Sequence, residues 1–481
     1  MSDQKKRTLK GGAGYFFSNV ITSGLGFLFI AISSRVLGPA EFGVLSLGLS
    51  VIGIAANFGS FGLPNTIQRY LSGRGEDRAN HLFGSILLLA TSFALLFATV
   101  FFTASEYIAI NIFDEPRLTI VLQVLSIGVA LRIMYSILNA VLQAQEHIKQ
   151  IVISKTTRSV CKIVFLGVVF LWVQNAVVAA LAGILATFVA SFYVISCIKK
   201  LDIKPNLPSK EDVKKVTAYS LPLVFVGFSY FLTQQTDRLM LGWLTTSSNV
   251  GIYTVVSTLA LIMSTFHGSL VSIFLPLASQ AYRNNEFEEL NETYLFISKW
   301  VGGINGFVAI VFAGFGVWIL TLFGPEYSNE VSYQILLLLS FLYFVGTWVG
   351  PTGALLQMSD GHRIEFYNTL VFVVLNIVLN YYFILLYGLA GAAIGTLISG
   401  LVRNTIQLIE IRYIYRLDVI RKENLVVLIY VLSTFVLCLF WENYRYFISL
   451  FSLACLPVYM YVKMDEFEAK LLRNTYKKYV G

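Results

Sequence analysis

The chain has 481 residues, of which 56% are hydrophobic and 13% are charged, and its formal net charge is +8. Soluble domains contain about 45–50% apolar and about 25% charged residues, so this composition lacks the polar surface of a water-soluble protein. The apolar runs are long and do not alternate with polar residues, which excludes a membrane β-barrel. We therefore expect an all-α, polytopic membrane protein.

The chain begins with a basic, polar segment, Met1 to Lys10, which we interpret as a cytoplasmic tail leading into the first span rather than as a cleaved signal. A membrane-spanning helix needs about 20 mostly apolar residues. Apolar windows predict about 14 spans, with these limits: 13–36, 41–66, 82–104, 118–142, 152–174, 176–198, 215–243, 249–279, 292–323, 330–357, 364–387, 389–412, 424–441 and 445–463.

Lysine and arginine residues gather in alternate connections between the predicted spans. Basic connections usually face the cytoplasm, so the pattern places both termini there, in a multi-pass protein of the cell (cytoplasmic or inner) membrane. The net positive charge then belongs to a cytoplasmic face. It does not indicate nucleic-acid binding, because no soluble basic domain with interleaved aromatic residues is present.

Short sequence matches recur in order along the two halves of the chain. The motif L-P-x-x-x-Q-x-Y occurs at 63–70 and again at 275–282, and Gly43 corresponds to Gly251. We interpret this as an internal duplication, with six spans in each half, both halves in the same orientation, and a substrate site between the halves. The predicted divisions are an N-terminal lobe (1–198), a cytoplasmic linker (199–215), a C-terminal lobe (216–413), and two extra spans with a basic tail (414–481).

Two stretches of sequence resemble a known group. Residues 34–43, SRVLGPAEFG, resemble the opening signature of polysaccharide-export flippases. Residues 236–242, TDRLMLG, followed by VGIY at 250–253, resemble the signature that opens the second lobe of these proteins. The group includes the O-antigen (Wzx-type) and teichuronic-acid exporters of the multidrug/oligosaccharidyl-lipid/polysaccharide superfamily.

The resemblance implies two six-helix bundles in a V around a central cationic cavity, and transport by alternating access. The implied cargo is a polyprenyl diphosphate-linked oligosaccharide, moved from the cytoplasmic to the outer leaflet. It also implies membrane lipids as partners, no cofactor and a monomer, with other polysaccharide assembly proteins as candidate partners. The related lipid II flippases use arginines of the first span, where this chain has only Asn19, with Arg35 at the far end.

The candidate substrate-binding residues are polar or charged positions inside or beside the spans. Arginine suits a diphosphate because its planar fork stays charged and donates bidentate hydrogen bonds. Arg132 lies inside the fourth span, where it either faces the cavity or forms a structural ion pair. Adjacent helical residues point about 100° apart, so Asp237 and Arg238 need not pair with each other. Arg35 and Arg69, at span ends, bind substrate or anchor the spans to lipid headgroups.

Four further cations, Arg158, Lys162, Lys299 and Arg403, lie one to two turns into spans from the cytoplasmic side. They form either a basic vestibule for the diphosphate or ordinary positive-inside anchors. Two residues are candidates for ion coupling: Asp237, and His267, which is otherwise a polar packing residue.

Two other functions are possible from the sequence. A cation-coupled multidrug exporter of the same superfamily commonly relies on carboxylates buried in its first lobe, whereas Glu41 and Glu106 lie at span ends here. A membrane polysaccharide polymerase or glycosyltransferase would need a catalytic loop or domain. The chain has no G-x-S-x-G, H-E-x-x-H or P-loop motif, so we expect neither an enzyme nor a metal site.

Overall fold

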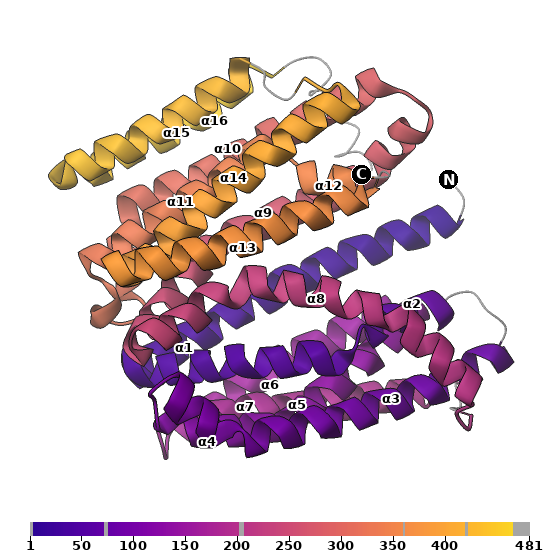
Figure 1. Cartoon of the computed structure of the whole chain (residues 1–481). Coiled ribbons are helices and arrows are strands. Elements are labelled where there is room, and N and C mark those ends of the chain that lie inside the picture. Colours follow the sequence, from indigo (N-terminus) through magenta and orange to yellow (C-terminus); the bar gives the residue numbers. More distant parts are fainter. Residues whose placement is uncertain (1–2, 72–75, 202–205, 359–360, 419–421, 465–481) are drawn as a thin grey trace. The chain divides into compact units, whose positions relative to one another are not determined.

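The computed structural model describes residues 3–71, 76–201, 206–358, 361–418 and 422–464. Throughout these ranges the regular elements are helices, which confirms the predicted all-α class (Figure 1). The chain divides into two compact units, Met1–Val255 and Val256–Gly481. The predicted lobes and linker follow the sequence repeat rather than these units, and they stay a prediction.

The first element, α1 (Asp3–Ser60), consists of two helices that meet at Gly38. Gly38 has φ +70° and ψ 172°, a conformation that essentially only glycine adopts, and Pro39 follows it at the start of the next helix. The chain reverses direction at this point (Figure 1). The predicted break between the first two spans, 13–36 and 41–66, is therefore confirmed.

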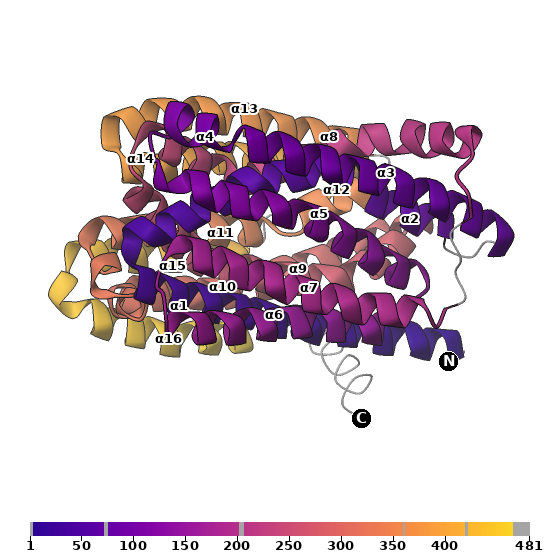
Figure 2. The ribbon, with the colours of Figure 1, turned by 90° about the horizontal axis from the view of Figure 1, so that it is seen from below.

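The rest of the first unit is a bundle in which α5 packs against α1, α3 and α7, and α6 packs against α1 and α7 (Figure 2). Asn175 and Ser209 cap α7 and α8 by accepting hydrogen bonds from backbone N–H groups. The elements are α2 (Leu63–Leu71), α3 (Glu76–Thr103), α4 (Ser105–Tyr107), the π-helix η1 (Ile108–Ile112), α5 (Arg117–Ala144), α6 (Ile148–Phe170), α7 (Ala176–Ile198), α8 (Lys210–Leu244) and the start of α9 (Ser247–Arg283).

Helix α8 packs along the second half of α1 within this unit. Gly53 lies against the ring of Phe231, Gly242 lies against Leu47, and Gly227 lies against Asn57. Small residues let the two backbones approach closely, which is how helices associate where lipid offers no hydrophobic driving force.

The second unit contains the remainder of α9 and a bundle built around α10, on which α11, α15 and α16 pack. Two buried tyrosines link α10 and α11 by hydrogen bonds. The hydroxyl of Tyr294 donates to the carbonyl of Val349 (2.6 Å), and that of Tyr333 donates to the carbonyl of Ala313 (2.6 Å). The elements are α10 (Phe287–Thr321), η2 (Pro325–Tyr327), α11 (Glu330–Val349), α12 (Thr352–Met358), α13 (His362–Tyr387), α14 (Leu389–Tyr415), α15 (Lys422–Phe440), η3 (Glu442–Tyr444) and α16 (Arg445–Val462).

Within the described ranges, 11 helices are long and apolar enough to cross a membrane. That number counts both halves of α1 as one helix and leaves out the short apolar α15. It also leaves out α6, which is long enough but carries Lys155, Arg158 and Lys162 close together. With these helices included, the structure agrees with the predicted multi-pass membrane protein.

Gly38 gives a test of the reversal in α1. A β-carbon at Gly38 would meet no atom within 4 Å, so Gly38→Ala changes only the backbone energy. We expect this substitution to destabilise the protein by about 1–3 kcal/mol, measured by thermal unfolding in detergent. Gly167→Ala is the control, because Gly167 also has open space but lies in an ordinary helix. Equal stability of the two variants would contradict the conformation described here.

Candidate functional site

Three cationic side chains of the first unit come together near the middle of two spans. Arg132 lies at the centre of the candidate span Leu118–Ala144, and Arg158 and Lys162 lie one turn apart in α6. Residues four apart share one face of a helix. Arg158 repels Arg132, and Lys162 is repelled by both, so the three charges lie close enough to interact. We call Arg132, Arg158 and Lys162 the cationic cluster.

Aromatic rings and hydroxyl groups hold two members of the cluster. Arg158 Nε donates to Thr187 Oγ1 of α7 (3.1 Å), and the guanidinium lies 5.1 Å from the centre of the Tyr135 ring. The hydroxyl of Tyr135 accepts a hydrogen bond from Ser154 (3.0 Å). Lys162 Nζ lies 3.3 Å from the centre of the Phe29 ring in α1. The site therefore draws on α1, α5, α6 and α7, and cation–π contacts replace part of its lost hydration.

The cluster has no carboxylate partner in the part of the chain that the structure describes. Ion pairs seen there, such as Arg117–Glu41 and Arg403–Glu365, join other residues. A cation at the centre of a span costs about 2.5–3.5 kcal/mol on insertion scales. Three such cations side by side are tolerable where water or an anion compensates them. The geometry therefore suits the binding of an anion with more than one negative charge.

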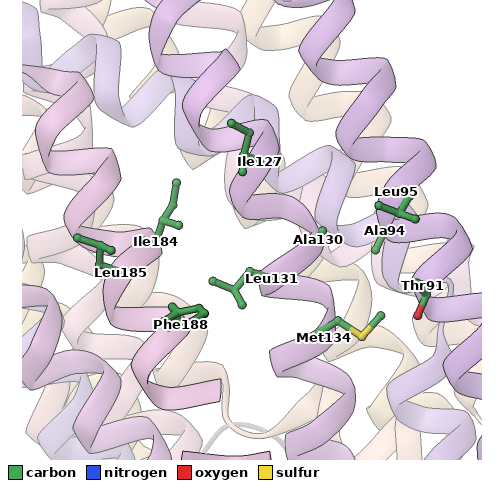
Figure 3. Close-up of a pocket in the computed structure, with 10 residues that line it drawn as sticks. All are labelled: Thr91, Ala94, Leu95, Ile127, Ala130, Leu131, Met134, Ile184, Leu185 and Phe188. Carbon is green, nitrogen blue, oxygen red and sulfur yellow. The ribbon is translucent and has the colours of Figure 1, made fainter. Parts of the chain in front are cut away.

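The opposite face of α5 is apolar and lines a groove of about 480 Å³ between α3, α5 and α7 (Figure 3). On α5 the groove uses Ile127, Leu131 and Met134, and on α7 it uses Ile184 and Phe188. Arg132 is the next residue after Leu131, so its side chain is rotated by about 100° around the helix axis. It therefore points away from the apolar face. Arg132 is also exposed. One face of α5 is thus suited to lipid, and the other presents a charge.

Asp237 and Arg238 have different neighbours. Arg238 donates to the side-chain oxygen of Gln235 (3.4 Å), which also accepts a hydrogen bond from Ser50 of α1 (2.8 Å). Asp237 accepts a hydrogen bond from the hydroxyl of Tyr253 in α9 (2.5 Å). These two residues therefore tie α8 to α1 and to α9.

The cationic cluster does not include several other predicted site residues. Arg35 is exposed beside the reversal at Gly38, whereas Arg69 lies at the end of α2 with its guanidinium 4.5 Å from the centre of the Tyr219 ring. Asn19 is part of α1, but its side chain lies outside the described residues. In the second unit, the buried Nδ1 of His267 has no hydrogen-bond partner among the described residues. Their predicted roles stay predictions.

The four residues of the predicted vestibule divide between the two units. Arg158 and Lys162 join Arg132, but Lys299 is buried in the second unit and donates to the carbonyl of Lys463 (2.7 Å). Arg403 forms an ion pair with Glu365 (2.6 Å) in that unit. The protein itself therefore supplies partners to Lys299 and Arg403.

Sequence reasoning missed the residues that surround the cluster. Tyr135 follows Arg132 by three positions, and Ser154 precedes Arg158 by four, so helical spacing could have indicated both. Phe29 and Thr187 belong to other helices, and no local pattern connects them to α5 or α6. They can be assigned to the site only when the packing of the helices is known.

Comparison with known proteins adds family information. Residues 8–282 match the family model described as polysaccharide biosynthesis protein, and residues 222–382 match the MatE model. A protein of Haloferax volcanii named "Probable low-salt glycan biosynthesis flippase Agl15" is 25% identical over 80% of this chain and 79% of its own length. The capsular polysaccharide biosynthesis protein CapF of Staphylococcus aureus is 22% identical over 83% of this chain and 97% of its own length.

Two solved structures are similar to this one in fold. The lipid II flippase MurJ, in an inward closed conformation, matches with a TM-score of 0.74 and 14% identity, over 93% of this chain and 98% of its own. An inward-facing multidrug resistance transporter of the MATE family matches with a TM-score of 0.64 and 18% identity, over 82% of this chain and 94% of its own. At these identities the likeness concerns the fold alone.

The mutual repulsion in the cluster leads to a stability prediction. Lys162→Met removes one of three like charges but keeps the apolar stem, at the loss of one cation–π contact worth about 0.5–2 kcal/mol. We expect the ligand-free protein to become more stable by about 1 kcal/mol, seen as a higher unfolding temperature. Lys200→Met, at an exposed position beyond α7, should leave the temperature unchanged. A lower unfolding temperature for Lys162→Met would show that the site is already neutralised.

Proposed function

Because this chain belongs to the polysaccharide biosynthesis protein family, we propose that it is a flippase for a lipid diphosphate-linked oligosaccharide. It moves this cargo from the cytoplasmic to the outer leaflet of the cell membrane by alternating access, for the synthesis of a surface polysaccharide or glycan. The relatives support a transport function, since Agl15 is named a glycan biosynthesis flippase. We also propose that the chain catalyses no covalent step.

The observation that carries this proposal is the cationic cluster, placed in mid-span without a carboxylate partner in the described residues. A diphosphate has about two negative charges, and it must leave water when its headgroup crosses the bilayer. The guanidinium of Arg132 is exposed and can donate two parallel hydrogen bonds to phosphate oxygens. Arg158 and Lys162 add the charge that balances the second phosphate.

A drug exporter of the same superfamily is the second candidate, because residues 222–382 match the MatE model. Drug cations would be repelled by the cationic cluster, whereas an anionic headgroup would be attracted to it. The charge of the site therefore favours the flippase. The energy source is a separate question, for which Asp237, His267 and the membrane potential are the candidates.

The alternate basic connections support a topology with both termini in the cytoplasm. In that orientation the first residues of α5 face the outside, and the ends of α2 and α5 face the cytoplasm. We propose that the protein works as a monomer, alongside other polysaccharide assembly proteins.

Substitution of Arg132 tests the transport function. We expect Arg132→Ala to abolish export, because the exposed bidentate donor is lost, and Arg132→Lys to restore it only in part, because an ammonium group lacks the fork. The measurements are surface polysaccharide in cells that lack the natural copy and the lipid-linked glycan that accumulates on the inner leaflet. The latter also identifies the cargo.

The matched control is Arg283→Ala, which removes an exposed arginine whose hydrogen bonds, within the described residues, go to Ser279 on its own helix. This variant should export normally. Export at the wild-type rate by Arg132→Ala, at equal protein level, would exclude the proposed role of the cationic cluster.

A further inference from the structure

A second group of charges joins the ends of four helices in the first unit, far along α5 from Arg132. Arg117, the first residue of α5, forms ion pairs with Glu41 of α1 (3.1 Å) and with Glu115 (2.8 Å). Glu115 also accepts a hydrogen bond from Ser247, the first residue of α9 (2.7 Å). The second oxygen of Glu41 accepts from the backbone N–H of Ala176, at the start of α7 (3.0 Å). We call Glu41, Glu115, Arg117 and Ser247 the charged clasp.

A direct backbone contact lies beside the charged clasp. A β-carbon added to Gly43 of α1 would collide with the carbonyl of Ser247, and one added to Gly251 of α9 would collide with the carbonyl of Pro39. The two collisions are reciprocal, so α1 and α9 touch through both glycines. Gly43 and Gly251 are also the corresponding positions of the sequence repeat. Only residues without side chains allow this approach of the two backbones.

The ion pairs of the charged clasp are weak enough to form and break reversibly. The side chain of Arg117 is 50% exposed and that of Glu41 is 29% exposed, and ion pairs open to solvent are individually weak. The hydrogen bonds from Arg117 hold the pKa of Glu115 below its usual range, so the pair remains charged at neutral pH. Several weak bonds in parallel can hold a contact firmly and still break together.

The clasp acts on the segment that connects the two compact units. Residues Ser247–Val255 of α9 belong to the first unit, and the helix continues from Val256 into the second. Any movement of the start of α9 away from α1 requires the Glu115–Ser247 hydrogen bond and the contact between Gly43 and Gly251 to separate. The clasp therefore restrains a helix that both units share.

We propose that the charged clasp is a reversible lock that holds the start of α9 against α1, and that its opening exposes the cationic cluster to the side of the membrane where α5 begins. This inference rests on the proposed transport function for the purpose of the movement, but the lock itself is testable without cargo. Glu41, Glu115, Arg117 and Ser247 are its charged or polar parts, and Gly43 and Gly251 are its contact surface.

The first experiment measures opening in the absence of cargo. The full-length protein, with its four natural cysteines replaced, carries Arg132→Cys and is treated in right-side-out vesicles with a membrane-impermeant thiol reagent. We expect Glu115→Gln to speed the labelling of this cysteine by about twofold to fivefold, the factor that an exposed ion pair is worth. Arg445→Gln, which removes an ion pair with Glu442 in the second unit, is the control and should leave the rate unchanged.

Equal labelling rates in Glu115→Gln and its parent would overturn the lock, whether or not the protein transports a lipid-linked glycan. Gly43→Ala should speed labelling further, because its β-carbon forces α1 and α9 apart. If Gly43→Ala fails to accumulate, the comparison of Glu115→Gln with its control still decides the matter.

The second experiment closes the lock by a covalent bond. Glu115→Cys and Ser247→Cys, in the same background with Arg132 retained, place two thiols where the 2.7 Å hydrogen bond was. We expect oxidation to reduce polysaccharide export at least tenfold and a reducing agent to restore it, with neither effect in the single variants. A cross-linked protein that exports as fast as the reduced one would show that the clasp is only a structural support. If the reduced protein also fails to export but the labelling rates change as expected, the proposed transport function is wrong and the proposed lock is not.

Discussion

A positive charge inside hydrocarbon must be matched by another group, and this requirement governs the first unit. Arg132, Arg158 and Lys162 are held close to one another with aromatic rings and hydroxyl groups around them, but without an acidic side chain from the described residues. A fold that only needed stability would have paired or removed these charges. Under the proposed function, the anionic headgroup of the cargo supplies the compensating charge.

The charged groups within the helices have different partners in the two units. In the second unit Arg403 has Glu365 as its partner, Glu365 also accepts from Gln407 (2.7 Å), and Lys299 donates to a carbonyl. These contacts join α14 to α13 and hold the residue after α16 against α10. The cationic cluster, which has no carboxylate partner among the described residues, belongs to the first unit.

The spans and the main candidate residue could be predicted from the sequence, because lipid requires long apolar helices and makes an interior arginine conspicuous. The break at Gly38 could also be predicted, because the apolar run around it is too long for one span.

The grouping of charges was harder to predict. The four-residue spacing of Arg158 and Lys162 placed them on one face, but their assignment to a vestibule with Lys299 and Arg403 relied on distance along the helices. Which helices meet around Arg132 depends on packing between distant segments, so Thr187 and Phe29 could not be found. Glu41 was likewise visible at a span end, but its link to Arg117 and Ala176 needed the folded unit.

The reversal at Gly38 also has a consequence for how the protein is made. The two halves of α1 are joined through a single glycine with an extended ψ, followed at once by Pro39, so there is no hydrophilic loop between them. The two helices therefore form a tight hairpin, and we expect them to enter the lipid together, so that errors at this residue would be felt during biogenesis, before any cargo is bound.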